Sequence, residues 1–217
     1  MLGGDWLQKF IFDVDGTILK ADWNYQEIYF NKVLSREDAR KFLPNISKLL
    51  AYYENNFIRY DINLLSNYLT EATGIKFTPD IIQGWLDAGK NYYEVVPGAY
   101  DILEYLKSKD KKLVALSNWF SEMNVTRLER AGLLKYFDNV YCSDQVDMKP
   151  TKSGFLTACG DTKSSDTVMV GDSLHFDIMV PMELGMDVIY YCPDESKRVD
   201  NPKIKVIRKL NDLKEMY

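Results

Sequence analysis

Cysteine and histidine are scarce in this chain of 217 residues. The three cysteines, Cys142, Cys159 and Cys192, are far apart and form no CxxC pair, and His175 is the single histidine. This pattern predicts neither a disulfide framework nor a zinc site. It favours a reducing compartment, with the cysteines in the core of the protein.

Long apolar runs and an excess of basic residues are also missing. No run is long enough to cross a membrane, and the opening MLGGDWLQKF lacks the pattern of a signal peptide. The 27 basic side chains are outnumbered by 32 acidic ones, for a net charge of -5. This balance disfavours nucleic acid as a partner but allows a small anionic substrate. We therefore expect a cytoplasmic protein without a membrane partner, and the sequence indicates no oligomeric state.

Apolar runs alternate with helical stretches from about residue 95 onward. The runs lie at 111–118, 139–143, 167–173 and 187–192, and an earlier one lies at 10–12. Helical patterns lie at 99–109, 122–131 and roughly 175–184, where Pro181 implies a kink or an early start. Such alternation predicts an α/β fold with a doubly wound parallel, Rossmann-like sheet that helices cover on both faces.

Residues 20–94 have apolar positions at helical spacing and no convincing strand. Thr78-Pro79-Asp80 is a good helix start, and we expect about four helices in this segment. The predicted organisation is an α/β core of residues 1–19 and 95–217, with residues 20–94 inserted as an all-helical cap domain. Eight of the fifteen tyrosines lie in this segment, where we expect them mainly in the cap's core or a dimer contact.

The stretch FIFDVDGTIL, at 10–19, places Asp13 and Asp15 directly after an apolar run. A buried carboxylate needs a partner, and Gly16 permits a sharp turn with a close backbone approach. Other polar residues follow the later runs: Ser117-Asn118, Lys149, Asp172-Ser173 and Asp177. Parallel strands gather such residues at one edge of the sheet. Acids brought together there repel one another, which a hard cation such as Mg²⁺ would relieve.

These motifs resemble the haloacid dehalogenase (HAD) superfamily, of the kind with a helical cap after the first strand. The four motifs of that family stand in order: DVDGT at 13–17, a strand ending in Ser117-Asn118, Lys149 before Pro150, and GDSLHFD at 171–177. The resemblance spans residue 10 to at least residue 190. The first and last motifs are specific, whereas the middle two are weak alone.

The resemblance implies a Mg²⁺-dependent phosphatase that hydrolyses a small phosphorylated metabolite through an aspartyl-phosphate. Asp13 would be the nucleophile, and a free aspartate is ionised at neutral pH without a base to activate it. Asp15 would protonate the departing alkoxide and then activate water. Asp13, Asp172 and the backbone carbonyl of Asp15 would hold the metal.

The other motif residues would bind or support the phosphoryl group. Ser117 and Asn118 would hold its oxygens, and Lys149 would neutralise charge on it and on the nucleophile. Asp177 would support either the metal-bound waters or Lys149. The remaining supporting residues are Gly16, Thr17 and Ser173. This mechanism needs no histidine, so we expect His175 to be structural or exposed.

Two departures and several alternatives accompany this interpretation. Trp119 stands where the family often has a small residue, and Val180-Pro181 replaces a small pair.

Asp15 favours phosphate chemistry over dehalogenation, because a halide leaving group needs no proton. A phosphonatase would place a cap lysine in the site for a Schiff base, and the candidates are Lys32, Lys41, Lys48, Lys76 and Lys90.

A phosphomutase would return the phosphoryl group to a sugar, and a non-catalytic binding module would lack a catalytic group, although none is missing. Sugar phosphates, phosphoglycolate-like acids and nucleoside monophosphates all remain open as substrates. The tyrosines favour nucleotides only slightly.

Overall fold

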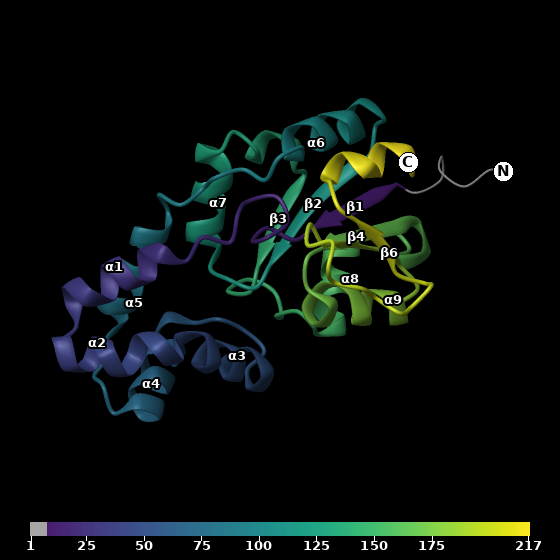
Figure 1. Ribbon diagram of the computed structural model, residues 1–217. Helices are drawn as coiled ribbons and strands as arrows, with labels where there is room; N and C mark the ends of the chain where they lie inside the picture. The colour runs from purple at the N-terminus through teal and green to yellow at the C-terminus, as the bar shows by residue number, and fades with distance from the viewer. Residues whose placement is uncertain (1–7) are drawn as a thin grey trace.

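The computed structural model describes residues 8–217, and within them a six-stranded parallel sheet forms the centre of the α/β unit (Figure 1). Its strands are β1 (Lys9–Phe12), β2 (Lys112–Ser117), β3 (Asn139–Cys142), β4 (Thr167–Gly171), β5 (Asp187–Tyr191) and β6 (Lys205–Ile207). Their order across the sheet is β3-β2-β1-β4-β5-β6. β1 therefore lies between β2 and β4, and the predicted fold class is confirmed.

Helices cover both faces of the sheet (Figure 1). They are α6 (Ala99–Ser108), α7 (Ser121–Arg130), α8 (Lys152–Cys159) and α9 (Met179–Glu183), with short helical turns η2 (Leu134–Tyr136), η3 (Ser164–Asp166), η4 (Leu174–Ile178) and η5 (Leu210–Glu215).

Alternation along β1 divides its side chains between these two layers. Phe10 and Phe12 pack in one apolar cluster with residues of α6 and η5, and Ile11 packs in another with Phe155 of α8. Successive side chains of a strand point to opposite faces, so a strand covered on both faces is apolar throughout. All four residues of β1 are buried accordingly.

The helices inserted within residues 20–94 pack together beside the sheet (Figure 1). They are α1 (Asn24–Val33), α2 (Arg36–Phe42), η1 (Leu43–Asn45), α3 (Ile46–Asn56), α4 (Ile62–Thr73) and α5 (Pro79–Gly89). Their apolar cluster is aromatic at its centre, with the rings of Phe30 and Trp85 5.0 Å apart. The predicted helix start is confirmed, because the Thr78 hydroxyl accepts a hydrogen bond from Ile81 N–H at 3.4 Å.

Contacts hold the inserted helices against the sheet. The loop between α3 and α4 meets the loop after β3, where Tyr60 N–H donates to the Ser143 carbonyl at 2.8 Å. In the same place, Met148 N–H donates to the Ile58 carbonyl at 2.7 Å. On the α5 side, Gln83 donates to Glu122 of α7 at 3.0 Å. The inserted helices are thus docked over the carboxyl ends of the strands.

The structure corrects several expectations about individual elements. Five α-helices, rather than about four, lie within residues 20–94. The unexpected one is α2, which is largely charged and lacks an apolar stripe. α8 and β6 were not expected: α8 carries Gly154 and little periodicity, and β6 has only three residues. The helix expected at 175–184 is divided into a π-helical turn, η4, and α9, with Pro181 in the first turn of α9.

Burial agrees with the expectation for cysteine, since all three are buried and unpaired. Among residues 8–217, no helix is both long and apolar enough to span a membrane. Residues 1–7, which the sequence assigns to the core, lie outside the described residues.

Candidate active site

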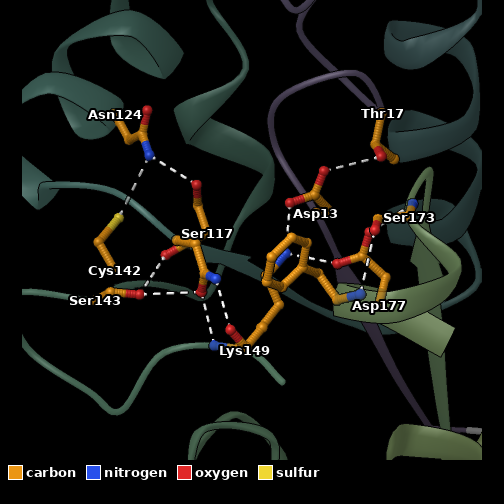
Figure 2. A network of polar contacts seen from close by, with 11 residues as sticks. Asp13, Thr17, Ser117, Asn124, Cys142, Ser143, Lys149, Ser173 and Asp177 are labelled. Atoms are coloured by element: carbon orange, nitrogen blue, oxygen red, sulfur yellow. Dashed lines mark hydrogen bonds and ion pairs between the residues drawn. The ribbon is translucent and has the colours of Figure 1, made fainter. Parts of the chain in front are cut away.

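Three strand ends bring the sequence-predicted residues to one place. Asp13 directly follows β1, Ser117 is the last residue of β2, and Asp172 directly follows β4. Because β1 pairs with both neighbours in parallel register, these ends are adjacent at one edge of the sheet. Lys149 reaches the same edge from the loop after β3 (Figure 2).

The ammonium group of Lys149 lies between two carboxylates (Figure 2). Its Nζ is 2.6 Å from Oδ1 of Asp13 and 2.6 Å from Oδ1 of Asp177, and all three side chains are buried. Burial alone would lower the pKa of Lys149, but the two carboxylates outweigh it and raise that pKa. Lys149 therefore stays charged and fixes the orientation of Asp13.

Each of these two carboxylates is also held at its second oxygen. The Thr17 hydroxyl donates to Oδ2 of Asp13 at 3.0 Å, and Ser173 N–H donates to Oδ2 of Asp177 at 3.0 Å. The predicted supporting residues Thr17, Ser173 and Asp177 thus all contact this group. Of the two expectations for Asp177, the geometry shows the contact with Lys149.

Asp172 completes a cluster of acids. Carboxylate oxygens of Asp13, Asp172 and Asp177 all lie within 4.8 Å of one another. Burial and the charges of Asp13 and Asp177 raise the pKa of Asp172 to about 8, although Lys149 opposes this.

The backbone approaches Asp172 closely at Gly16. Gly16 has a φ of 86°, and a Cβ at this position would lie 2.2 Å from Oδ2 of Asp172. The absent side chain therefore allows the Asp15-Gly16 backbone to lie beside the acids. An all-oxygen donor set with excess negative charge suits a hard divalent cation such as Mg²⁺.

Asp15 is held by a residue that the sequence did not single out. Nη2 of Arg127, on α7, lies 2.7 Å from Oδ1 of Asp15, and the Arg127 side chain is buried. Burial raises the pKa of Asp15 despite the opposing charge of Arg127. In the sequence, Arg127 is one of two arginines near a helix end, where a solvent-exposed position is the usual expectation. No local signal marked it.

The residues at the end of β2 have different partners. The Ser117 hydroxyl accepts a hydrogen bond from Asn124 of α7 at 2.9 Å. The Asn118 amide is committed to Lys149, because its Nδ2 donates to the Lys149 carbonyl and its Oδ1 accepts from Lys149 N–H, both at 2.7 Å. Asn118 therefore positions the lysine loop, and Asn124 is a further residue that the sequence did not identify.

A cavity of about 360 Å³ opens over these groups. The sheet edge and the inserted helices both line it, and the helices supply Trp23, Gln26, Ser47, Leu50, Ala51 and Glu54. Trp119 closes one side, with its ring 4.9 Å from Tyr60 and 5.2 Å from Trp85 of the inserted segment. The unusual Trp119 therefore connects the sheet edge with the helices above it.

Lys149 is the sole lysine or arginine that lines this cavity among residues 8–217. None of the five lysines considered for a Schiff base does so. Lys41 and Lys48 line a separate groove, and Lys90 pairs with Asp87 and Glu122. His175 is exposed and is not among the lining residues, as expected.

Comparison with known proteins identifies the family of the chain. Residues 9–180 match the family model of haloacid dehalogenase-like hydrolases. The chain belongs to this family. Pyrimidine 5'-nucleotidase PynA of Streptococcus pneumoniae is 32% identical in an alignment of length 201 that covers 84% of this chain and 83% of PynA. Pyrimidine 5'-nucleotidase YjjG of Escherichia coli is 26% identical over 191 residues, 84% and 83% of the two chains.

A solved structure shows the same fold. The HAD-hydrolase YfnB of Bacillus subtilis, bound to magnesium, has a TM-score of 0.75 at 24% identity, and the match covers 97% of this chain and 98% of YfnB. The resemblance seen in the sequence is therefore confirmed. This haloacid dehalogenase-like hydrolase is an enzyme of the phosphatase branch.

Proposed function

We propose that this hydrolase is a Mg²⁺-dependent phosphatase that cleaves small phosphomonoesters through an aspartyl-phosphate on Asp13. The observation that carries the proposal is the buried Asp13 carboxylate, which Lys149 holds at 2.6 Å beside the Asp172 acid cluster. Asp13, Asp172 and the backbone carbonyl of Asp15 would hold the metal. Mg²⁺ bound there would offset the repulsion between Asp13 and the phosphate dianion and polarise the phosphorus.

The residues of the chain account for the two chemical steps. In the first, an Asp13 oxygen attacks phosphorus and the ester oxygen leaves, taking a proton from Asp15. In the second, Asp15 takes a proton from water, and the water oxygen attacks the same phosphorus to release phosphate and free Asp13. The raised pKa of Asp15 favours the protonated form that the first step requires.

The other polar groups bind and orient the phosphoryl group in this mechanism. Lys149 would reduce the negative charge that develops on it, and the Ser117 hydroxyl would donate to one of its oxygens. Because the Asn118 amide is occupied by Lys149, any contact from Asn118 to the phosphoryl group would come from its backbone N–H. Asp177 would keep Lys149 in place.

The inserted helices would provide substrate selection. In this proposal residues 20–94 are a cap domain, and residues 8–19 and 95–217 are the catalytic core. Pyrimidine nucleoside 5'-monophosphates are the favoured substrates, since two relatives are pyrimidine 5'-nucleotidases. A cavity of about 360 Å³ is within the range of small-molecule sites. The three buried, unpaired cysteines are consistent with a cytoplasmic location.

The test measures phosphate release from a panel of nucleotides, sugar phosphates and phosphoglycolate, with and without Mg²⁺. Asp13→Asn is the control, because it keeps the shape of the side chain and removes the nucleophile. Metal-dependent turnover that this variant loses would support the proposal. A folded protein that releases phosphate from none of these esters would contradict it. Imine trapping by borohydride, or a requirement for a bisphosphate activator, would instead indicate a phosphonatase or a phosphomutase.

A further inference from the structure

Glu54 is the one carboxylate that the inserted helices contribute to the cavity, as far as residues 8–217 show. It lies on α3 with Ser47, Leu50 and Ala51, which line the same wall at positions three, four and seven residues apart. The Tyr60 hydroxyl donates to Oε1 of Glu54 at 3.0 Å. The other oxygen, Oε2, accepts no hydrogen bond from residues 8–217. It is not completely buried either. This oxygen is therefore open to a ligand.

The charge balance of the cavity is strongly negative. Its lining contains Asp13, Asp15, Glu54, Asp172 and Asp177, against the single ammonium of Lys149 in the described chain. That ammonium already contacts two carboxylates at 2.6 Å. Four of the five acids lie at the sheet edge, where Lys149, Arg127 and a bound metal ion would compensate their charge. Glu54 lies on the wall that the inserted helices form, and within residues 8–217 no lysine or arginine of that wall lines the cavity.

A carboxylate in this position discriminates between substrates by their charge and by their hydrogen-bond donors. A substrate with a second anionic group would approach Glu54 without a counter-ion, and the like-charge contact disfavours its binding whenever Glu54 is ionised. A hydroxyl or N–H group on the substrate would instead donate to the open oxygen. Burial, only partly offset by the Tyr60 hydroxyl and by Lys149, raises the pKa of Glu54 to about 7, in agreement with its poor compensation.

We propose that Glu54, oriented by Tyr60, is a specificity-determining residue that selects phosphomonoesters with a hydrogen-bond donor and no second negative charge in the part remote from the phosphate. This inference rests on the proposed function and narrows it. Nucleosides with ring N–H or sugar hydroxyl groups fit this requirement. Bisphosphates and phosphorylated acids do not. A purely structural role, in which Glu54 only anchors Tyr60, would leave substrate discrimination unaltered.

Uridine 5'-monophosphate and orotidine 5'-monophosphate form a suitable substrate pair, because they differ by one carboxylate. At about pH 8, where Glu54 is mostly ionised, the wild-type enzyme should prefer the uridine nucleotide in kcat/KM. Glu54→Gln keeps an acceptor for Tyr60 and removes the charge, so it should reduce this preference by about tenfold. Glu54→Lys, which supplies a cation, should reduce it further. Glu71→Gln is the matched control, since Glu71 is exposed and lines a separate groove, and its preference should equal that of wild type.

Tyr60→Phe supplies a second variant that retains the carboxylate but removes its hydrogen bond. It should raise KM for uridine 5'-monophosphate more than it lowers kcat, because it disturbs orientation and leaves the reacting groups in place. An unchanged ratio of kcat/KM values in Glu54→Gln, with the variant folded by circular dichroism, would overturn the proposal.

Binding separates this proposal from the proposed function. Calorimetric titration of the Asp13→Asn variant with both nucleotides measures discrimination without turnover, and the Asp13→Asn/Glu54→Gln variant tests the role of Glu54. Absence of turnover in the wild type would contradict the phosphatase activity, while about tenfold weaker discrimination in the double variant would still support Glu54. If the wild type turns over substrate but both inactive variants discriminate equally between the two nucleotides, the phosphatase activity is supported and the role of Glu54 is rejected.

Discussion

Arg127 of α7 connects Asp15 to the segment that leads from the inserted helices back to the sheet. Its Nη2 lies 2.7 Å from Oδ1 of Asp15, and its Nε donates to the Tyr92 carbonyl at 2.7 Å. Its Nη1 donates to Asn124, which in turn contacts Ser117. One buried side chain thus orients the proposed acid–base residue and contacts the residue that holds Ser117.

Replacing Arg127 should impair both stability and turnover. Arg127→Met leaves the Asp15 carboxylate without its partner in a buried site, which should cost about 3 kcal/mol of unfolding free energy. Misplacement of Asp15 should lower kcat by about 100-fold. Urea denaturation and steady-state kinetics measure these effects.

The exposed Arg130 is the control, and Arg130→Met should cost less than about 1 kcal/mol. The double variant Arg127→Met/Asp15→Asn should be more stable than Arg127→Met, since no unpaired charge remains. If the double variant and Arg127→Met were equally stable, the unpaired Asp15 carboxylate would not be the cause of the lost stability.

Gly16→Ala should abolish activity while the fold remains. The new Cβ would lie 2.2 Å from Oδ2 of Asp172, so the acid or the backbone would have to move. Gly132→Ala is a matched control, because Gly132 also has a positive φ, of 65°, but no atom within 4 Å of the added Cβ. Both variants should lose about 1 kcal/mol through backbone strain. If Gly132→Ala lost activity equally, strain and not the contact with Asp172 would explain the result.

Mg²⁺ should raise the melting temperature of the wild-type protein. The carboxylates of Asp13, Asp172 and Asp177 are held within 4.8 Å of one another, and a bound cation relieves their repulsion. At 100 times its dissociation constant, a ligand that binds only the folded state adds about 2.7 kcal/mol. Asp172→Asn should lose most of this gain. Differential scanning calorimetry with EDTA and with Mg²⁺ measures it, and an equal Mg²⁺ shift in the variant would exclude Asp172 as a ligand.

Glu54 should reduce the stability of the protein as the pH rises. Its pKa is raised from 4.5 to about 7, so the folded state binds more protons than the unfolded state between these values. Stability due to this group therefore falls as the pH increases through that window. Glu54→Gln removes the effect, and its advantage over wild type should grow toward pH 7 and reach about 3 kcal/mol. Urea denaturation across this range measures the difference, and a constant difference would contradict the assignment.

Local sequence patterns were sufficient to predict the strands and helices that carry the motif residues. β1 is apolar from Phe10 to Phe12 because helices cover both faces of the sheet, and this run placed Asp13 and Asp15 at a strand end. The capping of α5 by Thr78 follows from neighbouring residues alone. The short β6 and the charged α2 have weak local patterns, and their formation depends on packing against elements distant in the chain.

The sequence by itself determined which residues come together at the edge of the sheet, because the order and direction of parallel strands constrain the positions of their ends. Only the tertiary structure decided the partners of those residues. Arg127 meets Asp15 across 112 positions, and the Asn118 amide binds the backbone of Lys149 across 31. Glu54 reaches the cavity because the inserted helices dock over the strand ends. Such contacts depend on how separate elements pack, which no local pattern encodes.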